Sequence, residues 1–204
     1  MLKNFINKKY LNENEIDRIS TKFIKEKPYP HFVLNNFFNK VVVSKLKKEI
    51  LKEKFYKQDR DLFSFLNTHE LKYSQNKIIK DFFNFLCLMK FLKYIEELTN
   101  GKNLKSIDMH AHLFKRGNYL LFHDDVVEGR KIAYIVYLSE GFKSKDGGRL
   151  QLYDIKNSIK PIKNIVPTFN SFVCFKVSKK SLHAIEEVKT NKQRLTIGGW
   201  FYGN

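Results

Sequence analysis

The sequence has little cysteine, glycine or proline, and it has no long apolar run. Of its 204 residues only two are cysteines, Cys87 and Cys174, and both lie inside apolar stretches, where a cysteine is usually a small buried hydrophobe. The lack of a disulfide framework predicts a reducing, cytoplasmic location. The absence of a bilayer-length apolar stretch and of a signal-peptide core predicts no contact with membranes.

Negative charge is also scarce. The chain has 38 Lys and Arg residues against 21 Asp and Glu residues, which gives a formal net charge of +17. Such a field attracts anions and favours proximity to RNA, to the ribosome or to an acidic protein face. Because lysine is spread through nearly every segment, a compositional bias explains the charge equally well, and both interpretations stay open.

Aromatic residues are abundant, with 19 Phe and 10 Tyr, and the length fits one domain, residues 1–204, with a substantial core. The first half, about 1–104, is predicted to be mostly helical support. Residues 11–26 are polar and compatible with a helix, and helical spacing of apolar residues predicts helices over 39–55 and 78–98. His31 to Leu34 is predicted as a short strand, and the mixed polar segment 56–75 as a long loop.

The second half, residues 105–204, changes character. It holds short runs of β-branched and aromatic residues separated by Gly, Asn and Pro turn signals. The runs are Ile107–Phe114, Tyr119–Phe122, Ile132–Leu138, Leu150–Tyr153, Ser171–Val177, Ala184–Val188 and Arg194–Phe201. This pattern predicts an antiparallel barrel or jelly roll preceded by packing helices, a mainly β fold of the α+β class.

The most informative triplet is His123-Asp124-Asp125. On a strand, side chains at i and i+2 point to one face, so His123 and Asp125 are expected to converge while Asp124 faces away. One imidazole and one carboxylate are two thirds of the facial triad that suits non-heme iron(II) and leaves coordination positions open. An isolated His-x-Asp triplet is a weak signal, because such triplets arise often by chance.

A third ligand is predicted at His183, within a predicted strand. A lone histidine there is more often a satisfied core residue, but Arg194 follows eleven residues later on another apolar strand. Burying arginine is costly unless it pairs with an anion, and its planar fork matches a carboxylate. Thr196 shares the face of Arg194 and is expected to donate a further hydrogen bond. The alternative for Arg194 is an exposed edge position or a structural ion pair.

A competing ligand pair is His110 and His112, which also share a strand face. A His-x-His pair begins the metal site of some barrel proteins, but no glutamate follows at a convincing spacing. The more economical interpretation is that both histidines line the barrel or pack at its mouth.

Several blocks together resemble the prolyl-hydroxylase-like 2-oxoglutarate and iron(II) dioxygenases, and among them the catalytic domain of the ribosomal-protein prolyl hydroxylases. The similarity covers nearly the whole chain, and the order and spacing of its blocks make it specific. The blocks are Leu120–Asp125, Gly129–Leu138, Gly147–Tyr153, Pro167–Asn170, His183–Val188 and Arg194–Tyr202, with weaker matches at Pro28–His31 and Asp61–Phe65.

The resemblance implies a double-stranded β-helix (jelly-roll) core with iron(II) on His123, Asp125 and His183. It also implies that Arg194 holds the distal carboxylate of 2-oxoglutarate, with help from Tyr137 and Thr196. Oxidative decarboxylation of this co-substrate to succinate, with O2 and in some cases ascorbate, then accompanies hydroxylation of a C–H bond.

The resemblance further implies a protein substrate, a ribosomal protein or a translation factor. Residues 56–75 correspond to a segment that closes over the substrate in the family, which makes Asp61, Phe63 and Phe65 candidates for peptide contact; a plain surface loop is the alternative. One departure is Phe114, where relatives tend to carry a tyrosine that holds 2-oxoglutarate, and Tyr119 is a candidate to compensate.

Two further functions stay open. One is an oxygenase that hydroxylates another residue type or a small molecule, which a closed pocket would favour over an open groove. The other is an inactive, basic module that binds RNA or the ribosome; its affinity would fall steeply with salt and survive loss of His123.

Overall fold

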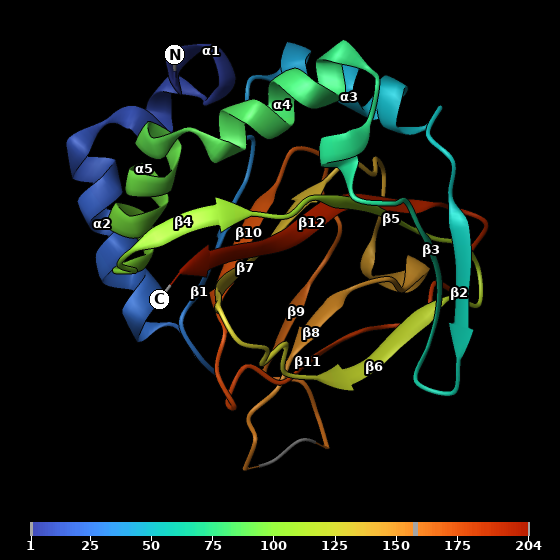
Figure 1. Cartoon of the computed structure of the whole chain (residues 1–204). Coiled ribbons are helices and arrows are strands. Elements are labelled where there is room, and N and C mark those ends of the chain that lie inside the picture. Colours follow the sequence, from blue (N-terminus) through green and yellow to red (C-terminus); the bar gives the residue numbers. More distant parts are fainter. Residues whose placement is uncertain (1, 157–158, 204) are drawn as a thin grey trace.

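In the part of the chain that the structure describes, five α-helices gather against one face of a strongly curled β-sheet (Figure 1). The computed structural model describes residues 2–156 and 159–203. The helices are α1 (Leu2–Phe5), α2 (Glu13–Lys25), α3 (Lys40–Ile50), α4 (Lys77–Cys87) and α5 (Met89–Thr99). None of them is both long and apolar enough to cross a lipid bilayer.

Asparagine side chains cap the N-termini of three of these helices. Asn12, Asn39 and Asn76 accept hydrogen bonds from the first free backbone N–H groups of α2, α3 and α4, as helix N-caps do. The segment predicted as one helix over 78–98 is two helices, so that prediction is wrong. Leu88 adopts an extended conformation between α4 and α5, and the bend lets Phe85 pack on Phe91 with ring centroids 4.7 Å apart. The apolar periodicity continues across the bend and hides it.

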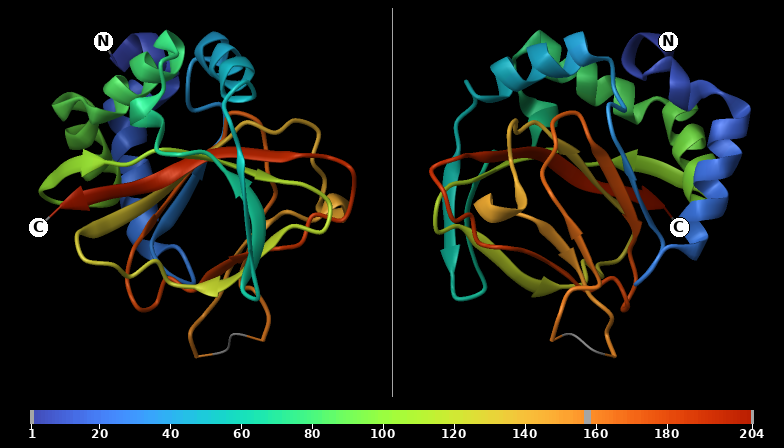
Figure 2. Two further views of the ribbon diagram at one scale, coloured as in Figure 1. Left: turned by 45° about the vertical axis from the view of Figure 1, so that its right-hand side comes forward. Right: turned by 180° about the vertical axis from the view of Figure 1, so that it is seen from behind.

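The sheet consists of twelve antiparallel strands within the described residues. In chain order they are β1 (His31–Leu34), β2 (Tyr56–Arg60), β3 (Phe63–Asn67), β4 (Leu104–Ile107), β5 (His110–Phe114), β6 (Tyr119–His123), β7 (Arg130–Tyr137), β8 (Leu150–Leu152), β9 (Lys163–Ile165), β10 (Phe172–Lys176), β11 (His183–Ile185) and β12 (Arg194–Gly203). Their order across the sheet is β1-β10-β7-β12-β5-β3-β6-β11-β8-β9, with β2 on β3 and β4 on β12. The sheet is strongly curled (Figure 2), and the two ends of this order, β1 and β9, line one cavity.

The mainly β architecture with a few packing helices is confirmed, but two details of the prediction are wrong. Residues 56–75, predicted as a loop, contain the hairpin β2–β3 and a 3-10 turn at Leu71–Tyr73. The hairpin is a full member of the sheet, because β3 pairs with both β5 and β6. Strand β9 was not predicted, since only Ile165 of its three residues is buried.

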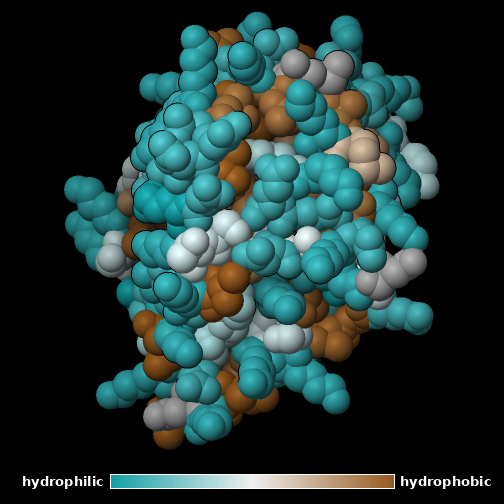
Figure 3. All heavy atoms as spheres, turned by 90° about the vertical axis from the view of Figure 1, so that its left-hand side faces the viewer, coloured by the Kyte–Doolittle hydropathy of each residue, from teal (hydrophilic) through white to brown (hydrophobic). Residues whose placement is uncertain are grey.

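The central strands are apolar on both faces because both faces are covered. On β10, Phe172 and Cys174 pack with the helices in one core cluster, whereas Val173 and Phe175 pack in a second cluster inside the barrel. The same alternation on β12 sends Leu195 to the helices. The outer surface seen from the side of α2 is mostly hydrophilic, with apolar side chains showing between the charged ones (Figure 3).

Asn170 ties the helical layer to the sheet. Its side chain accepts a hydrogen bond from the Phe38 backbone N–H at 3.0 Å and donates one to the Phe38 carbonyl at 2.8 Å. Its own backbone has φ of 60°, a left-handed conformation that asparagine tolerates better than most residues. Its backbone N–H donates to the carbonyl of Tyr137, so this turn also positions the end of β7.

We expect Asn170→Ala to lower the free energy of unfolding by about 2–3 kcal/mol, since it removes two buried hydrogen bonds and leaves alanine at positive φ. Asn170→Gly removes the same bonds without the conformational penalty, and its loss should be smaller. Urea unfolding of both variants measures the difference. Equal losses would show that the left-handed backbone contributes nothing.

Candidate metal centre and co-substrate pocket

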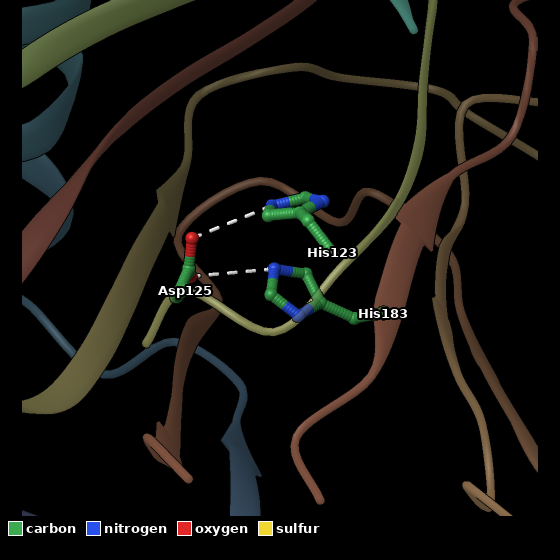
Figure 4. A group of neighbouring side chains, drawn as sticks. All are labelled: His123, Asp125 and His183. Carbon is green, nitrogen blue, oxygen red and sulfur yellow. Dashed lines mark ion pairs between the residues drawn. The ribbon is translucent and has the colours of Figure 1, made fainter. Parts of the chain in front are cut away.

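His123, Asp125 and His183 lie together inside the barrel (Figure 4). Within the described residues they are the one group of three or more His, Cys, Asp and Glu side chains whose ligand atoms lie within 4.8 Å of one another. The two histidines are directly opposed in the pairing of β6 with β11, so their side chains share one face. Asp125 Oδ1 lies 3.4 Å from His123 Nε2, and Oδ2 lies 3.4 Å from His183 Nε2.

Backbone carbonyls fix the orientation of both imidazoles. His123 Nδ1 lies 2.9 Å from the Leu121 carbonyl, and His183 Nδ1 lies 2.7 Å from the Ser181 carbonyl. A carbonyl only accepts, so each Nδ1 carries the proton and each Nε2 presents its lone pair toward Asp125. This is the arrangement in which histidine binds a metal ion.

Asp125 reaches the site by a route that strand alternation did not predict. Strand β6 ends at His123, and Asp125 has φ of 64° in the following loop. The expectation of two strand positions on one face is therefore wrong, although the two side chains do converge. The loop is anchored to the segment before β11, because Ser181 Oγ donates to the Asp124 carbonyl at 2.8 Å.

The protonation states suit a cation. Burial raises the pKa of Asp125, but at the low pH where this carboxyl titrates both imidazoles are protonated, and the hydrogen bond from His183 and the charges of His183 and His123 outweigh burial and bring the pKa to about 2. Burial and the neighbouring His183 lower the pKa of His123 below its ordinary value. At neutral pH the group therefore offers one carboxylate and a neutral imidazole at His123.

A cavity of about 280 Å³ opens beside this group and reaches Arg194. Arg194 is 1% exposed and lies on the inner face of β12, where its Nε donates to the Gly148 carbonyl at 2.9 Å. Its guanidinium carbon lies 5.0 Å from the centre of the Phe114 ring and 5.2 Å from that of Tyr137. No carboxylate of the described residues forms a salt bridge with it.

Two buried polar groups lack a partner among the described residues: one belongs to Arg194, which lines the cavity, and the other to Tyr137, which lies behind the lining with its ring beside the Arg194 guanidinium. Arg194 Nη2 and the Tyr137 hydroxyl are buried without a hydrogen bond to any described residue. Thr196 is paired directly with Tyr137 across β12 and β7 and lines the same cavity. A buried cation beside unsatisfied donors is costly unless an anion joins them, so the donor set fits a small carboxylate.

The two histidines of the competing ligand pair, His110 and His112, lie in different surroundings. His112 lines the cavity and is paired with Thr196 across β5 and β12; burial, with the charges of His110 and Arg194, lowers its pKa to about 3. His110 does not line the cavity, and neither residue belongs to the three-residue group. Tyr119 is also outside the cavity, and its hydroxyl lies 3.3 Å from the Asp61 carbonyl.

The three residues predicted for peptide contact lie on the β2–β3 hairpin. Phe63 and Phe65 line the cavity, and the Phe65 ring stacks on Phe114 with centroids 5.1 Å apart. Asp61 is exposed in the turn between the strands and does not line the cavity.

Sequence reasoning missed Trp200, whose ring lines the cavity. The Arg130 guanidinium lies 3.3 Å from the centre of that ring. Trp200 stands six residues after Arg194 on the same long strand, so the alternation that placed Thr196 on the inner face also places Trp200 there.

We expect His183→Ala to abolish high-affinity binding of a divalent metal, because two ligands remain and the Nε2 lone pair is gone. Titration with Mn²⁺ followed by electron paramagnetic resonance measures the affinity. His110→Ala is the matched control, and it should bind Mn²⁺ like the unaltered protein. Loss of binding in the His110 variant alone would place the metal elsewhere.

Comparison with known proteins gives a consistent result. Residues 109–202 match the model of the 2OG-Fe(II) oxygenase superfamily. Prolyl 3-hydroxylase OGFOD1 of Xenopus laevis is 35% identical over 181 residues, covering 86% of this chain and 35% of that protein. Prolyl 3,4-dihydroxylase OGFOD1 of Ostreococcus tauri is 31% identical over 197 residues, covering 86% and 38%. The chain thus spans little more than a third of the length of these relatives.

Solved structures share the fold. A prolyl-4-hydroxylase of Pseudomonas putida superposes with a TM-score of 0.74 at 16% identity, covering 93% of this chain and 99% of that one. A prolyl hydroxylase of Trichoplax adhaerens, solved with a peptide fragment of a hypoxia-inducible factor, gives 0.74 at 15% identity, covering 93% and 91%. The predicted jelly-roll fold is confirmed. Residues 109–202 are thus similar to the 2-oxoglutarate- and iron(II)-dependent oxygenase superfamily, and this similarity implies iron(II), 2-oxoglutarate and O2 as cofactor and co-substrates.

Proposed function

We propose that this protein is an iron(II)- and 2-oxoglutarate-dependent prolyl hydroxylase whose substrate is a protein, and that the target belongs to the translation machinery. The observation that carries the catalytic part is one cavity with His123, Asp125 and His183 on its wall and a buried, unpaired Arg194 in reach of it. The names of the relatives support proline as the hydroxylated residue.

In this proposal the two Nε2 atoms and the Asp125 carboxylate hold iron(II). Their hydrogen-bonded Nδ1 groups keep the rings in place without a metal, so binding costs little rearrangement. Two imidazoles and one carboxylate form the facial triad that suits non-heme iron(II), a ligand set that would leave further coordination positions for a co-substrate and oxygen. The bound iron, with 2-oxoglutarate and O2, supplies the oxidising chemistry in which one oxygen atom enters a substrate C–H bond.

Arg194, Tyr137 and Thr196 hold the distal carboxylate of 2-oxoglutarate. Burial lowers the pKa of Arg194, but from an ordinary value so high that the group stays charged. The Tyr137 hydroxyl remains protonated, because burial raises its pKa, and so it donates a hydrogen bond. Phe114 offers no hydroxyl but packs on the guanidinium. His112, neutral and beside Thr196, stands where a further donor is needed.

The protein substrate enters past the β2–β3 hairpin. Phe63 and Phe65 form an aromatic wall that excludes water from the reacting atoms, and Asp61 is placed to meet an approaching peptide. Residues 1–204 act as one catalytic domain in this proposal, because β1 and β3 from the first half belong to the same sheet as the iron ligands. The net charge of +17 supports a target near RNA.

The proposed activity is tested with iron-loaded protein, 2-oxoglutarate, oxygen and a panel of proline-containing peptides from ribosomal proteins and translation factors. We expect succinate release that rises with one peptide, together with the gain of one oxygen atom on a proline of that peptide. Mass spectrometry of the peptide gives the readout. Succinate release without peptide oxidation by any member of the panel would contradict the proposed substrate class, and no release at all would contradict the activity.

Tyr137→Phe should change stability and co-substrate binding in opposite directions. The variant removes a buried hydroxyl that has no partner in the described part of the chain, so unfolding should cost as much free energy as before or slightly more. Affinity for 2-oxoglutarate should fall about fivefold, the value of one hydrogen bond. Calorimetric titration with 2-oxoglutarate in the presence of Mn²⁺ measures the second effect.

Arg194→Lys should lower the affinity for 2-oxoglutarate more than Tyr137→Phe does, by about ten- to a hundredfold. Lysine keeps the positive charge but lacks the paired donors of the guanidinium. The exposed Arg116 gives the control variant Arg116→Lys. Unchanged affinity in both the Tyr137 and Arg194 variants would place 2-oxoglutarate elsewhere.

A further inference from the structure

The two ends of the sheet, β1 and β9, face a second cavity, separate from the one that the metal group lines. This cavity has a volume of about 370 Å³. Its wall includes four residues of β1, three of β9 and, from α2, Arg18, Ile19 and Lys22. No residue of the metal group lines it.

The outer edge of β1 presents unpaired backbone groups. In an antiparallel pair, alternate residues bond to the partner strand and the others point away from it. Lys176 N–H donates to the Pro30 carbonyl, which sets the alternation for the pairing of β1 with β10: Phe32 and Leu34 face β10. His31 and Val33 therefore direct their N–H and C=O groups outward, and no described residue pairs with them there.

Strand β9, on the opposite side of the cavity, also has backbone groups that no described strand pairs with. The Tyr153 N–H donates to the Leu182 carbonyl, and the Glu186 N–H donates to the Arg149 carbonyl. By alternation, the backbone N–H and C=O of Gln151 on β8 point to β11, whereas those of Leu150 and Leu152 point to β9. The partners of those two residues on β9 are Ile165 and Lys163.

Asn164 lies between them and consequently turns its backbone N–H and C=O toward the cavity. Two sheet edges with free hydrogen-bonding groups thus line one cavity, and such edges are the usual docking site for an added strand.

Side chains of the cavity add apolar contact and positive charge. Val33, Ile165 and Val166 provide apolar surface. Arg18, Lys22 and Lys163 line the cavity, and Lys25 and Lys27 line the adjoining hollow.

Glu26 is the one acidic residue that lines either hollow, and it pairs with Lys22 at 3.3 Å. Lys25, Lys27 and Lys163 have no carboxylate partner within the described residues. The excess of cations selects an anionic occupant.

We propose that this cavity is a docking site for an extended, acidic segment of a partner protein, which adds to the β1 edge as a further strand and lies against β9. His31 is 1% exposed and Val33 is half-buried, so main-chain hydrogen bonds to Val33 hold the segment, and the lysines select its glutamate or aspartate side chains. The site is separate from the metal group, so it recruits a partner without taking part in the oxidation.

The probe for the experiment is a fluorescein-labelled peptide of about eight alternating glutamate and valine residues, long enough to span the edge. Fluorescence polarisation should show saturable binding, and the amide resonances of His31 and Val33 should shift in nuclear magnetic resonance spectra. The same peptide with lysine in place of glutamate should bind at least tenfold more weakly.

Val33→Pro is the decisive variant, because it removes the outward N–H at an edge position where proline is tolerated. It should abolish binding of the acidic peptide, whereas the matched control Val33→Thr keeps the N–H and should retain binding.

Lys163→Glu should weaken binding at least fivefold, and Lys105→Glu, an exposed position on β4, should not. Lys163→Glu leaves the backbone edge intact, so it tests the site even if Val33→Pro does not fold. Release of succinate with 2-oxoglutarate should be the same in all these variants.

Three outcomes would overturn the proposal. The first is no peptide binding by the unaltered protein, and the second is binding that Val33→Pro leaves intact. The third is a preference for another occupant at the same edge. Oligouridylate that binds more tightly than the peptide and competes with it would identify nucleic acid. A dimer in analytical ultracentrifugation that Val33→Pro dissociates would identify a second copy of this chain.

Discussion

The burial of a single guanidinium inside the barrel is the constraint around which the site is arranged. Arg194 is 1% exposed, and the one hydrogen bond that it makes within the described part of the chain goes to the Gly148 carbonyl. A charge in that position is unfavourable unless an anion completes its coordination. The curled sheet places the group within one cavity of His123, Asp125 and His183. An anion bound to Arg194 would therefore lie in the same cavity as a metal ion held by these three residues, which explains why the buried arginine and the metal group occur together.

The metal group in turn depends on contacts that precede any ligand. Strand pairing opposes His123 to His183, and carbonyls hold each ring by its Nδ1. Ser181 joins the two sides, since its hydroxyl bonds to the Asp124 carbonyl and its carbonyl accepts from His183. This preorganisation lets three side chains from two strands and a loop act as one site.

Much of this could be predicted from the sequence, for reasons that the structure makes clear. Strands such as β7 and β12 are buried on both faces, so their apolar runs are long enough to recognise. The hairpin β2–β3 is hard to recognise in the sequence because β2 is mostly polar and no residue of either strand is fully buried. The left-handed Asp125 was also unpredictable, because positive φ in a non-glycine residue leaves no sequence signal. His112 was expected among the residues that line the barrel, and it lines the cavity. Trp200 was missed, although its even spacing from Arg194 and Thr196 on β12 places it on the same inner face.

The most direct test of the account is a crystal structure of the protein grown without oxygen, with Mn²⁺ in place of iron and with 2-oxoglutarate. The account predicts an anomalous peak between His123, Asp125 and His183, and a distal carboxylate bound to Arg194 and the Tyr137 hydroxyl. A metal ion bound at other residues, or 2-oxoglutarate bound away from Arg194, would contradict it.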